Sequence, residues 1–308
     1  MKSKLLYWLV YGGMWLVSAL PFRLLYLLSD FNYLLIYHLV KYRRKVVREN
    51  LAKSFPEKSD AERGQIERRF YHYLSDYMLE DLKLLHMSAD DLRRRMTYKN
   101  TEQYLELTEK YGGIIVMIPH YANYEWLIGM GAVMKPGDVP AQVYKPLKDK
   151  YLDELFKRIR SRFGGYNIPK HSTAREIIRL KRAGKKMVVG LITDQWPSGD
   201  RYWTTFLGRE TAFLNGAERI AKMMNFPVFY CELTKNHRGY CEAEFTLMTE
   251  TPKETAEGEI TEMFARRLEQ TLRREPAYWL WSHKRWKRTS EECRRNEQEE
   301  KEKKKEQQ

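Results

Sequence analysis

Residues 112–126, GGIIVMIPHYANYEW, contain the segment that decides the fold. An apolar run at 113–119, bounded by glycine and proline, is typical of a buried strand. His120 follows at once, and Glu125 comes five residues later. The plain interpretation is a loop with a polar residue and a capped helix. The alternative is a chemical site at the end of a strand, and the rest of the chain has to decide between the two.

Beyond this segment, predicted strands alternate with predicted helices, which favours an α/β sandwich over an all-α protein. Apolar runs indicate strands at 113–119, 139–144, 186–192, 226–233 and 240–248. Helical spacing indicates helices near 124–134, 148–163, 173–183, 215–224 and 257–274. Residues 46–110 are polar and helix-like, and Ser59 with Asp60 supplies a helix start signal.

The chain has 308 residues, enough for one large domain or two small ones, and a formal net charge of +14. Residues 285–308 hold nine basic and seven acidic side chains, so +12 remains on the first 284 residues. The excess therefore belongs to the body of the protein, where it favours anionic partners.

The N-terminal stretch 5–22, LLYWLVYGGMWLVSALPF, contains no charged residue and has about the length that spans a hydrocarbon core as a helix. A second apolar stretch, 24–40, is interrupted by Asp30 and Asn32. Basic residues that suit anionic lipid headgroups on the cytoplasmic side follow directly: Lys41, Arg43, Arg44, Lys45 and Arg48. We predict a membrane anchor and basic collar over residues 1–45.

Two other interpretations of the N-terminus remain open. Val17-Ser18-Ala19 fits a signal-peptide cleavage site loosely, and the stretch could also be a buried hydrophobic hairpin of a soluble protein. At the other end, the charged tail 289–308 is low in apolar residues, and we expect it to be disordered or a frayed helix.

His120 and Glu125 are predicted as a catalytic dyad. On one continuous helix five residues rotate by about 500°, which would point the two side chains about 140° apart. They can meet if His120 precedes the helix and Glu125 lies in its first turns, a geometry that Pro119 favours. A carboxylate behind an imidazole fixes its tautomer and stabilises the imidazolium, which makes a general base. Because the chain has no G-x-S-x-G motif, the alcohol would belong to the substrate.

Several short blocks in a fixed order resemble the glycerolipid acyltransferase superfamily. The closest resemblance is to the late acyltransferases that add secondary lauroyl or myristoyl chains to lipid A. PHYANYEW (119–126) is similar to the first block, and Lys145 stands where arginine is common in the second. The other blocks are NLAKSFPEKS (50–59), VYKP (143–146), RIRSRFG (158–164), TDQ (193–195), FLGRETAF (206–213) and EPAYWLWSHKRWKR (275–288).

This resemblance covers about residues 5–288 and implies a glycerol-3-phosphate-acyltransferase-like mixed sheet flanked by helices, with an N-terminal membrane helix. Residues 46–288 would form the acyltransferase domain. The resemblance also implies an inner-membrane enzyme whose catalytic domain faces the cytoplasm. Its reaction would move a fatty acyl chain from acyl carrier protein to a hydroxyl of a lipid A precursor.

Four further residues are predicted to bind substrate. Arg158 and Arg160 could hold phosphate or sugar groups, because a guanidinium binds such groups through two parallel hydrogen bonds. Asp194 and Gln195 end the strand predicted at 186–192, where α/β folds place site residues. The plainer alternatives are a solvated helix face for the arginines and a turn or cap for Asp194 and Gln195. His283 is interpreted as structural, since no nearby acid pairs with it.

We predict no cofactor, no metal and no nucleic acid partner. The three cysteines lack the spacing of metal ligands, and no Walker or dinucleotide glycine pattern occurs. The predicted partners are acyl carrier protein, a lipid acceptor and an anionic membrane surface. A phospholipid or other glycolipid acyltransferase remains an alternative within the enzyme class. A non-catalytic, membrane-tethered lipid-binding protein is the alternative outside it.

Overall fold

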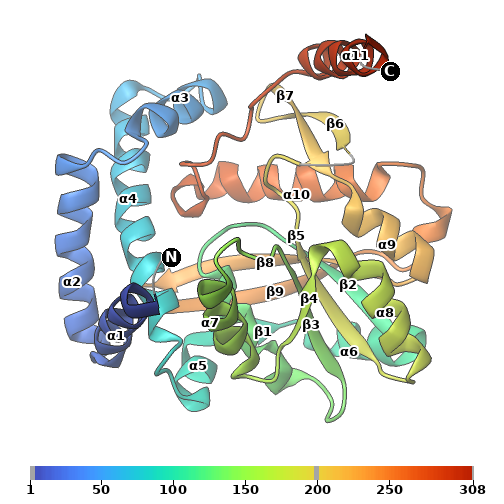
Figure 1. Cartoon of the computed structure of the whole chain (residues 1–308), viewed down its shortest axis with the longest axis horizontal. Helices are drawn as coiled ribbons and strands as arrows, with labels where there is room; N and C mark the ends of the chain where they lie inside the picture. Colours follow the sequence, from blue (N-terminus) through green and yellow to red (C-terminus); the bar gives the residue numbers. More distant parts are fainter. Residues whose placement is uncertain (1–3, 198–200, 307–308) are drawn as a thin grey trace.

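The computed structural model of the protein describes residues 4–197 and 201–306. Its centre is a seven-stranded mixed sheet with the strand order β1-β9-β8-β2-β5-β3-β4 (Figure 1). The strands are β1 (Met96–Lys99), β2 (Gly113–Ile118), β3 (Val139–Tyr144), β4 (Tyr166–Pro169), β5 (Met187–Ile192), β8 (Val228–His237) and β9 (Tyr240–Thr249). Only β8 and β9 pair antiparallel within this order. The predicted α/β fold with a mixed sheet is confirmed.

Every residue of β2 is buried, because the strand lies between β5 and β8 near the middle of the sheet. Continuous apolar runs of this kind are typical of strands covered on both faces. On α10, for example, Phe264 is buried and its ring centroid lies 5.7 Å from that of Tyr230 on β8. The flanking helices are α5 (Ala89–Arg95), α6 (Thr101–Tyr111), α7 (Lys150–Ser161), α8 (Thr173–Arg182), α9 (Gly216–Met224) and α10 (Glu259–Arg274).

Several elements differ from the sequence-based expectations. Residues 124–133 form a 3-10 helix, η2 (Tyr124–Val133), where an α-helix was expected. For the tail, a disordered segment and a frayed helix were both left open, and the structure has α11 (Ser290–Glu306) there. A separate antiparallel hairpin of β6 (Arg201–Phe206) and β7 (Arg209–Leu214) was not predicted, nor were β1 and β4. The described residues also include three short 3-10 turns: η3 (Lys170–Ser172), η4 (Pro252–Glu254) and η5 (Pro276–Tyr278).

The N-terminal part of the chain is helical. Its elements are α1 (Lys4–Ala19), α2 (Phe22–Leu34), a π-helical turn η1 (Leu35–Leu39), α3 (Arg44–Ser54) and α4 (Asp60–Lys83). The predicted start at Ser59 is confirmed, since Ser59 and Glu62 form a reciprocal capping box.

Within residues 4–197 and 201–306, no helix is both long and apolar enough to cross a membrane. The uncharged stretch 5–22 does not form the expected single membrane helix. Its first part is α1, which ends at Ala19, and α2 begins at Phe22 after Pro21. Proline lacks the backbone N–H that a helix interior requires, so the helix divides there.

One face of α2 and η1 is apolar and exposed. Leu25, Ser29 and Tyr33 are buried at helical spacing, and α2 packs with this side against α4. On the opposite side, Leu27 is 66% and Phe31 64% exposed. We call this exposed set the apolar face of α2: Leu24, Leu27, Phe31, Leu34 and Leu35.

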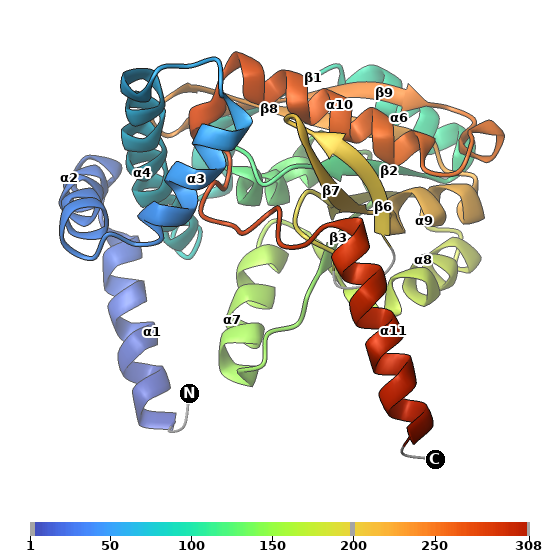
Figure 2. The same ribbon diagram turned by 90° about the horizontal axis from the view of Figure 1, so that it is seen from above.

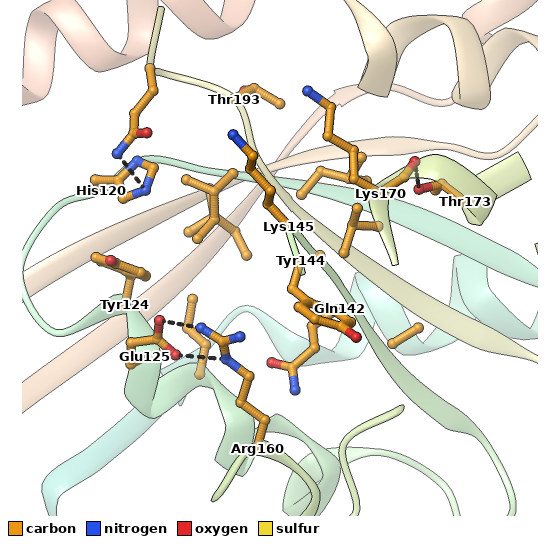
Figure 3. Close-up of a pocket in the computed structure, with 18 of the residues that line it drawn as sticks. His120, Tyr124, Glu125, Gln142, Tyr144, Lys145, Arg160, Lys170, Thr173 and Thr193 are labelled. Carbon is orange, nitrogen blue, oxygen red and sulfur yellow. Dashed lines mark hydrogen bonds and ion pairs between the residues drawn. The ribbon is translucent and has the colours of Figure 1, made fainter. Parts of the chain in front are cut away.

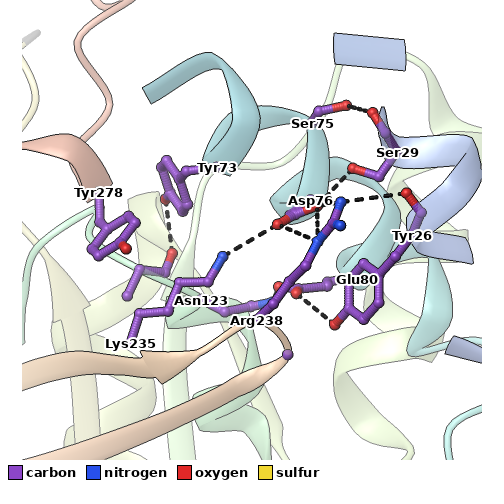
Figure 4. Close-up of polar contacts among 12 residues, drawn as sticks. Tyr26, Ser29, Tyr73, Ser75, Asp76, Glu80, Asn123, Lys235, Arg238 and Tyr278 are labelled. Carbon is purple, nitrogen blue, oxygen red and sulfur yellow. Dashed lines mark hydrogen bonds and ion pairs between the residues drawn. The ribbon is translucent and has the colours of Figure 1, made fainter. Parts of the chain in front are cut away.

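A polar cluster joins α2 and α4 to the turn between β8 and β9 (Figure 4). Asp76 accepts hydrogen bonds from Ser29 (2.7 Å) and from two nitrogens of Arg238 (2.6 and 3.0 Å). Arg238 also forms an ion pair with Asp30 at 2.6 Å. Because Asp76 is buried, these charge-assisted bonds fix the N-terminal helices to the sheet.

Candidate active site

The register of the sheet brings His120 and Asp194 together. Strands β2 and β5 are parallel neighbours, and Ile118 pairs with Ile192 at their carboxyl ends. His120 and Asp194 each follow two residues later, so both lie just beyond the same edge of the sheet. Open α/β sheets place ligand sites at this edge.

Asp194 holds the imidazole of His120 from behind. Its Oδ1 lies 2.5 Å from His120 Nδ1, and its Oδ2 accepts bonds from the His120 backbone N–H (3.0 Å) and from Trp279 Nε1 (2.7 Å). Burial by itself would raise the pKa of Asp194, but the charge of His120 and these hydrogen bonds outweigh burial and lower it. Asp194 is therefore a buried carboxylate that holds both the ring and the backbone of His120 and is itself bonded by Trp279.

The opposite nitrogen of His120 faces the pocket. An ionised carboxylate can only accept hydrogen bonds, so His120 Nδ1 carries a proton and donates to Asp194. Gln195 Nε2 lies 3.0 Å from His120 Nε2 and donates to it. A neutral imidazole with Nε2 unprotonated is in the form that accepts a proton from a substrate.

The loop that carries His120 is fixed from several sides. Tyr73 on α4 donates to the Ala122 carbonyl at 2.8 Å, and the Ala122 N–H donates to the Tyr278 carbonyl at 2.9 Å. Asn123 donates to buried Glu80 at 2.9 Å. Ala122 itself has a φ of 47°, a left-handed conformation that residues with a side chain adopt rarely. These hydrogen bonds hold a strained turn two residues after His120; Tyr73, Asn123 and Glu80 are drawn in Figure 4.

Glu125 has a different partner from the one that we predicted. Its carboxylate accepts two bonds from Arg160 on α7, at 2.9 Å to Nη2 and 3.3 Å to Nε. The ring of Tyr124 lies against His120, with centroids 4.9 Å apart, and stands between His120 and Glu125 (Figure 3). The structure thus corrects the predicted pairing: the carboxylate bonded to His120 is that of Asp194. A catalytic role for Glu125 stays a prediction.

The pair also affects the pKa of Arg160. Burial alone would lower the pKa of its guanidinium, but the charge and hydrogen bonds of Glu125 outweigh burial and raise it. Glu125 and Arg160 both line the same cavity as His120. The pair therefore places a protonated, oriented guanidinium inside the site.

A cavity of about 820 Å³ opens in front of His120. Its rim carries Lys145 and Lys170, and the backbone of Gly190 on β5 forms part of its wall. An added Cβ at Gly190 would lie 3.1 Å from Ile118 Cδ1, so only glycine leaves this part of the wall flat. Much of the remaining wall is apolar and comes from β2, η2, β3, α7 and β5, through Ile118, Leu127, Ile128, Val143, Phe156 and Ile192. Such a cavity suits an aliphatic chain whose reactive end lies at His120.

The other predicted site residues are placed as follows. Gln195 lines the cavity with Arg160, and Asp194 lies behind His120. Arg158 is exposed and does not line the cavity. The next residue on the helix, Ile159, is buried in the core.

His283 accepts a hydrogen bond from the backbone N–H of Trp196 at 3.2 Å. Burial lowers the pKa of His283 to about 4, so it stays neutral near pH 7. This supports a structural role for His283. Two residues of the site were not predicted: Trp279, which bonds Asp194, and Tyr124, which packs on His120. The tryptophans of the block 275–288 were interpreted as suiting a membrane headgroup surface, whereas Trp279 is buried.

Comparisons with known proteins agree on one family. A family model described as bacterial lipid A biosynthesis acyltransferase matches residues 1–288. The chain is 24% identical over 222 residues to the Haemophilus influenzae protein named lipid A biosynthesis acyltransferase, which covers 70% of this chain and 68% of that one. It is 22% identical over 284 residues to the Escherichia coli K12 protein named lipid A biosynthesis lauroyltransferase, covering 91% and 90%.

Proposed function

The chain belongs to the family of bacterial lipid A biosynthesis acyltransferases, and from this membership we propose how its site carries out acyl transfer. The donor is a fatty acyl thioester of acyl carrier protein, and the acceptor is a hydroxyl of a lipid A precursor. The observation that carries the proposal is the placement of His120, which lines a largely apolar cavity while Asp194 holds Nδ1 on the other side of the ring.

In the proposed reaction, His120 Nε2 removes the proton of the acceptor hydroxyl as its oxygen attacks the thioester carbonyl. Asp194 stabilises the imidazolium that forms. The new C–O bond gives a tetrahedral intermediate, whose collapse breaks the C–S bond. The proton on His120 then passes to the departing sulfur, and the ester and the free thiol of the carrier leave the site.

The oxyanion of the intermediate requires a donor, and Arg160 supplies a fixed guanidinium within the cavity. Donors held in place before the reaction contribute most to such stabilisation. Glu125 orients this guanidinium through two hydrogen bonds. In this proposal Glu125 acts on the arginine and Asp194 acts on the histidine, so the two carboxylates have separate roles.

The direct test uses the purified full-length protein, acyl-loaded carrier protein and a lipid A precursor. Mass spectrometry of the lipid should show the addition of one acyl group, and the carrier should lose the same group. A phospholipid acceptor under the same conditions serves as the control. Acylation of the phospholipid alone would replace the proposed acceptor, and lipid binding without any acyl transfer would favour a lipid-binding protein.

We also propose that the protein attaches to the cytoplasmic face of the inner membrane through the apolar face of α2. Helices that lie in a membrane surface combine an apolar side with neighbouring basic residues. Exposed Lys41, Arg43 and Lys45 follow this face directly and can contact anionic headgroups. In this arrangement α2 lies in the plane of one leaflet while its buried side stays packed on α4.

Replacing Leu27 and Phe31 together by glutamate is expected to lower binding to anionic phospholipid vesicles by roughly tenfold or more, because two apolar side chains leave the membrane. Co-sedimentation in high salt measures this, since salt screens the basic residues but not apolar insertion. Met223→Glu on α9, at a position 49% exposed, is the matched control and should bind like the wild type. Equal binding of all three proteins would contradict the in-plane attachment.

A further inference from the structure

The basic excess of the chain is concentrated in one segment. Residues 170–186, KHSTAREIIRLKRAGKK, contain seven lysine or arginine residues and a single glutamate. Their formal charge of +6 is a large part of the +14 on the whole chain. The segment forms η3, α8 and the turn that leads into β5.

Three arginines of α8 lie on one side of the helix. Thr173, Ile177 and Leu180 are buried at the spacing of a single face. Arg175, Arg179 and Arg182 repeat the same spacing two residues later and are all exposed. We call these three arginines, with Lys185 just beyond them, the α8 basic face. The one acid of the segment, Glu176, already pairs with Arg179 at 2.9 Å.

The segment that carries this face begins at the cavity. Lys170 and Thr173, at the start of the segment, both line the cavity that contains His120. A partner bound along α8 would therefore lie beside the cavity rim. The reactive end of a chain that it carried could enter from there.

The α8 basic face also points away from the proposed membrane contact. In both views of the ribbon, α2 lies near one end of the long axis of the molecule and α8 near the other (Figure 1, Figure 2). Within residues 170–186, all of which the structure describes, no large apolar side chain is prominently exposed. A helix that inserts into a membrane needs such side chains, and the apolar side of α8 packs on the protein instead. The face thus suits a soluble anionic partner.

We propose that the α8 basic face is the docking surface for the acidic carrier protein that delivers the acyl thioester. This inference rests on the proposed function and adds the position of the donor on the molecule. Complementary charge raises the rate of encounter between two proteins and fixes their orientation, without requiring a large apolar interface. The acceptor lipid would then approach from the α2 side and the donor from the α8 side, with His120 between them.

The test reverses two charges on this face in the full-length protein. Arg175→Glu with Arg182→Glu is expected to lower kcat/KM for the carrier-bound donor by about tenfold or more, because steering and docking are lost. With a small acyl-pantetheine thioester, which has no acidic protein to dock, the rate should stay within about twofold of the wild type. The dependence of the carrier rate on salt should also become weaker.

Lys253→Glu with Arg267→Glu is the matched control, since both residues are exposed and the change in formal charge is the same. It should keep the wild-type rate with both donors. Equal carrier rates for the two double variants would overturn the docking surface, as would an equal loss with both donors in the α8 variant. Loss of binding to anionic vesicles, with carrier kinetics unchanged, would assign the face to lipid instead.

Failure of the inference can be told apart from failure of the proposed function. If the wild-type protein transfers acyl chains from the carrier and the α8 variant does so equally well, only the docking surface is wrong. If the wild-type protein transfers from neither donor, the proposed function is wrong and the docking surface falls with it.

Discussion

Replacing His120 by alanine is expected to lower kcat by about 10²–10⁴-fold, the range typical of a lost general base. The Nε2 lone pair that removes the hydroxyl proton disappears, while the cavity and the Glu125–Arg160 pair remain. Asp194 keeps two of its donors in this variant, the backbone N–H of residue 120 and Trp279 Nε1, so the protein should stay folded. The measurement is single-turnover acyl transfer with the purified variant at saturating acceptor.

His237→Ala is a suitable control for this variant, because His237 is exposed at the end of β8. It should keep the rate of the wild type. Near-normal turnover of His120→Ala would exclude the general-base mechanism. Loss of the folded state, seen as a collapsed thermal transition, would instead show that the histidine has a structural role.

The second large effect is expected at Asp194, and it separates the two carboxylates of the site. Asp194→Asn should lower kcat by about 10²–10⁴-fold, because the amide can donate to Nδ1 and shift the ring proton to Nε2. It also removes the charge that stabilises the imidazolium. Glu125→Gln should lower kcat less, by about tenfold, since it weakens only the orientation of Arg160.

Comparing these two isosteric variants in one assay decides which carboxylate acts on His120. A larger loss in Glu125→Gln than in Asp194→Asn would restore the pairing expected from the sequence and imply that the site rearranges when substrate binds. Circular dichroism of both variants checks that the comparison is made between folded proteins. Arg160→Lys tests the second pair separately, because a lysine cannot form two parallel bonds to Glu125.

Much of the fold could be predicted from the sequence. The apolar runs at 113–119, 139–144 and 186–192 correspond closely to β2, β3 and β5. The β6–β7 hairpin was missed because its strands, RYWTTF and RETAFL, carry polar residues among the apolar ones. Leu207 and Gly208 form its two-residue turn, with φ values of 49° and 73°, but Leu-Gly is not a residue pair that marks such a turn in a sequence. Strands β1 and β4 span four residues each, too few for a periodic pattern.

The sequence singled out His120 and Asp194, but not the contact between them. His120 and Asp194 were each identified from the strand that precedes them. Their contact depends on β2 and β5 being neighbours in the sheet, although 74 residues separate the two side chains in the chain. Local spacing favoured Glu125, which is nearer in sequence. The left-handed turn at Ala122 and the start of η2 at Tyr124 then direct Glu125 toward α7.

The flat wall at Gly190 has a consequence for how such enzymes diverge. The proton chemistry resides in two loops beyond β2 and β5, whereas the space that we assign to the acyl chain is enclosed largely by η2, β3 and α7. A methyl group added at Gly190 would lie 3.1 Å from Ile118 Cδ1, so we expect it to narrow that space from the β5 side. Under the proposed function, a single codon away from His120 and Asp194 would then influence which fatty acids fit.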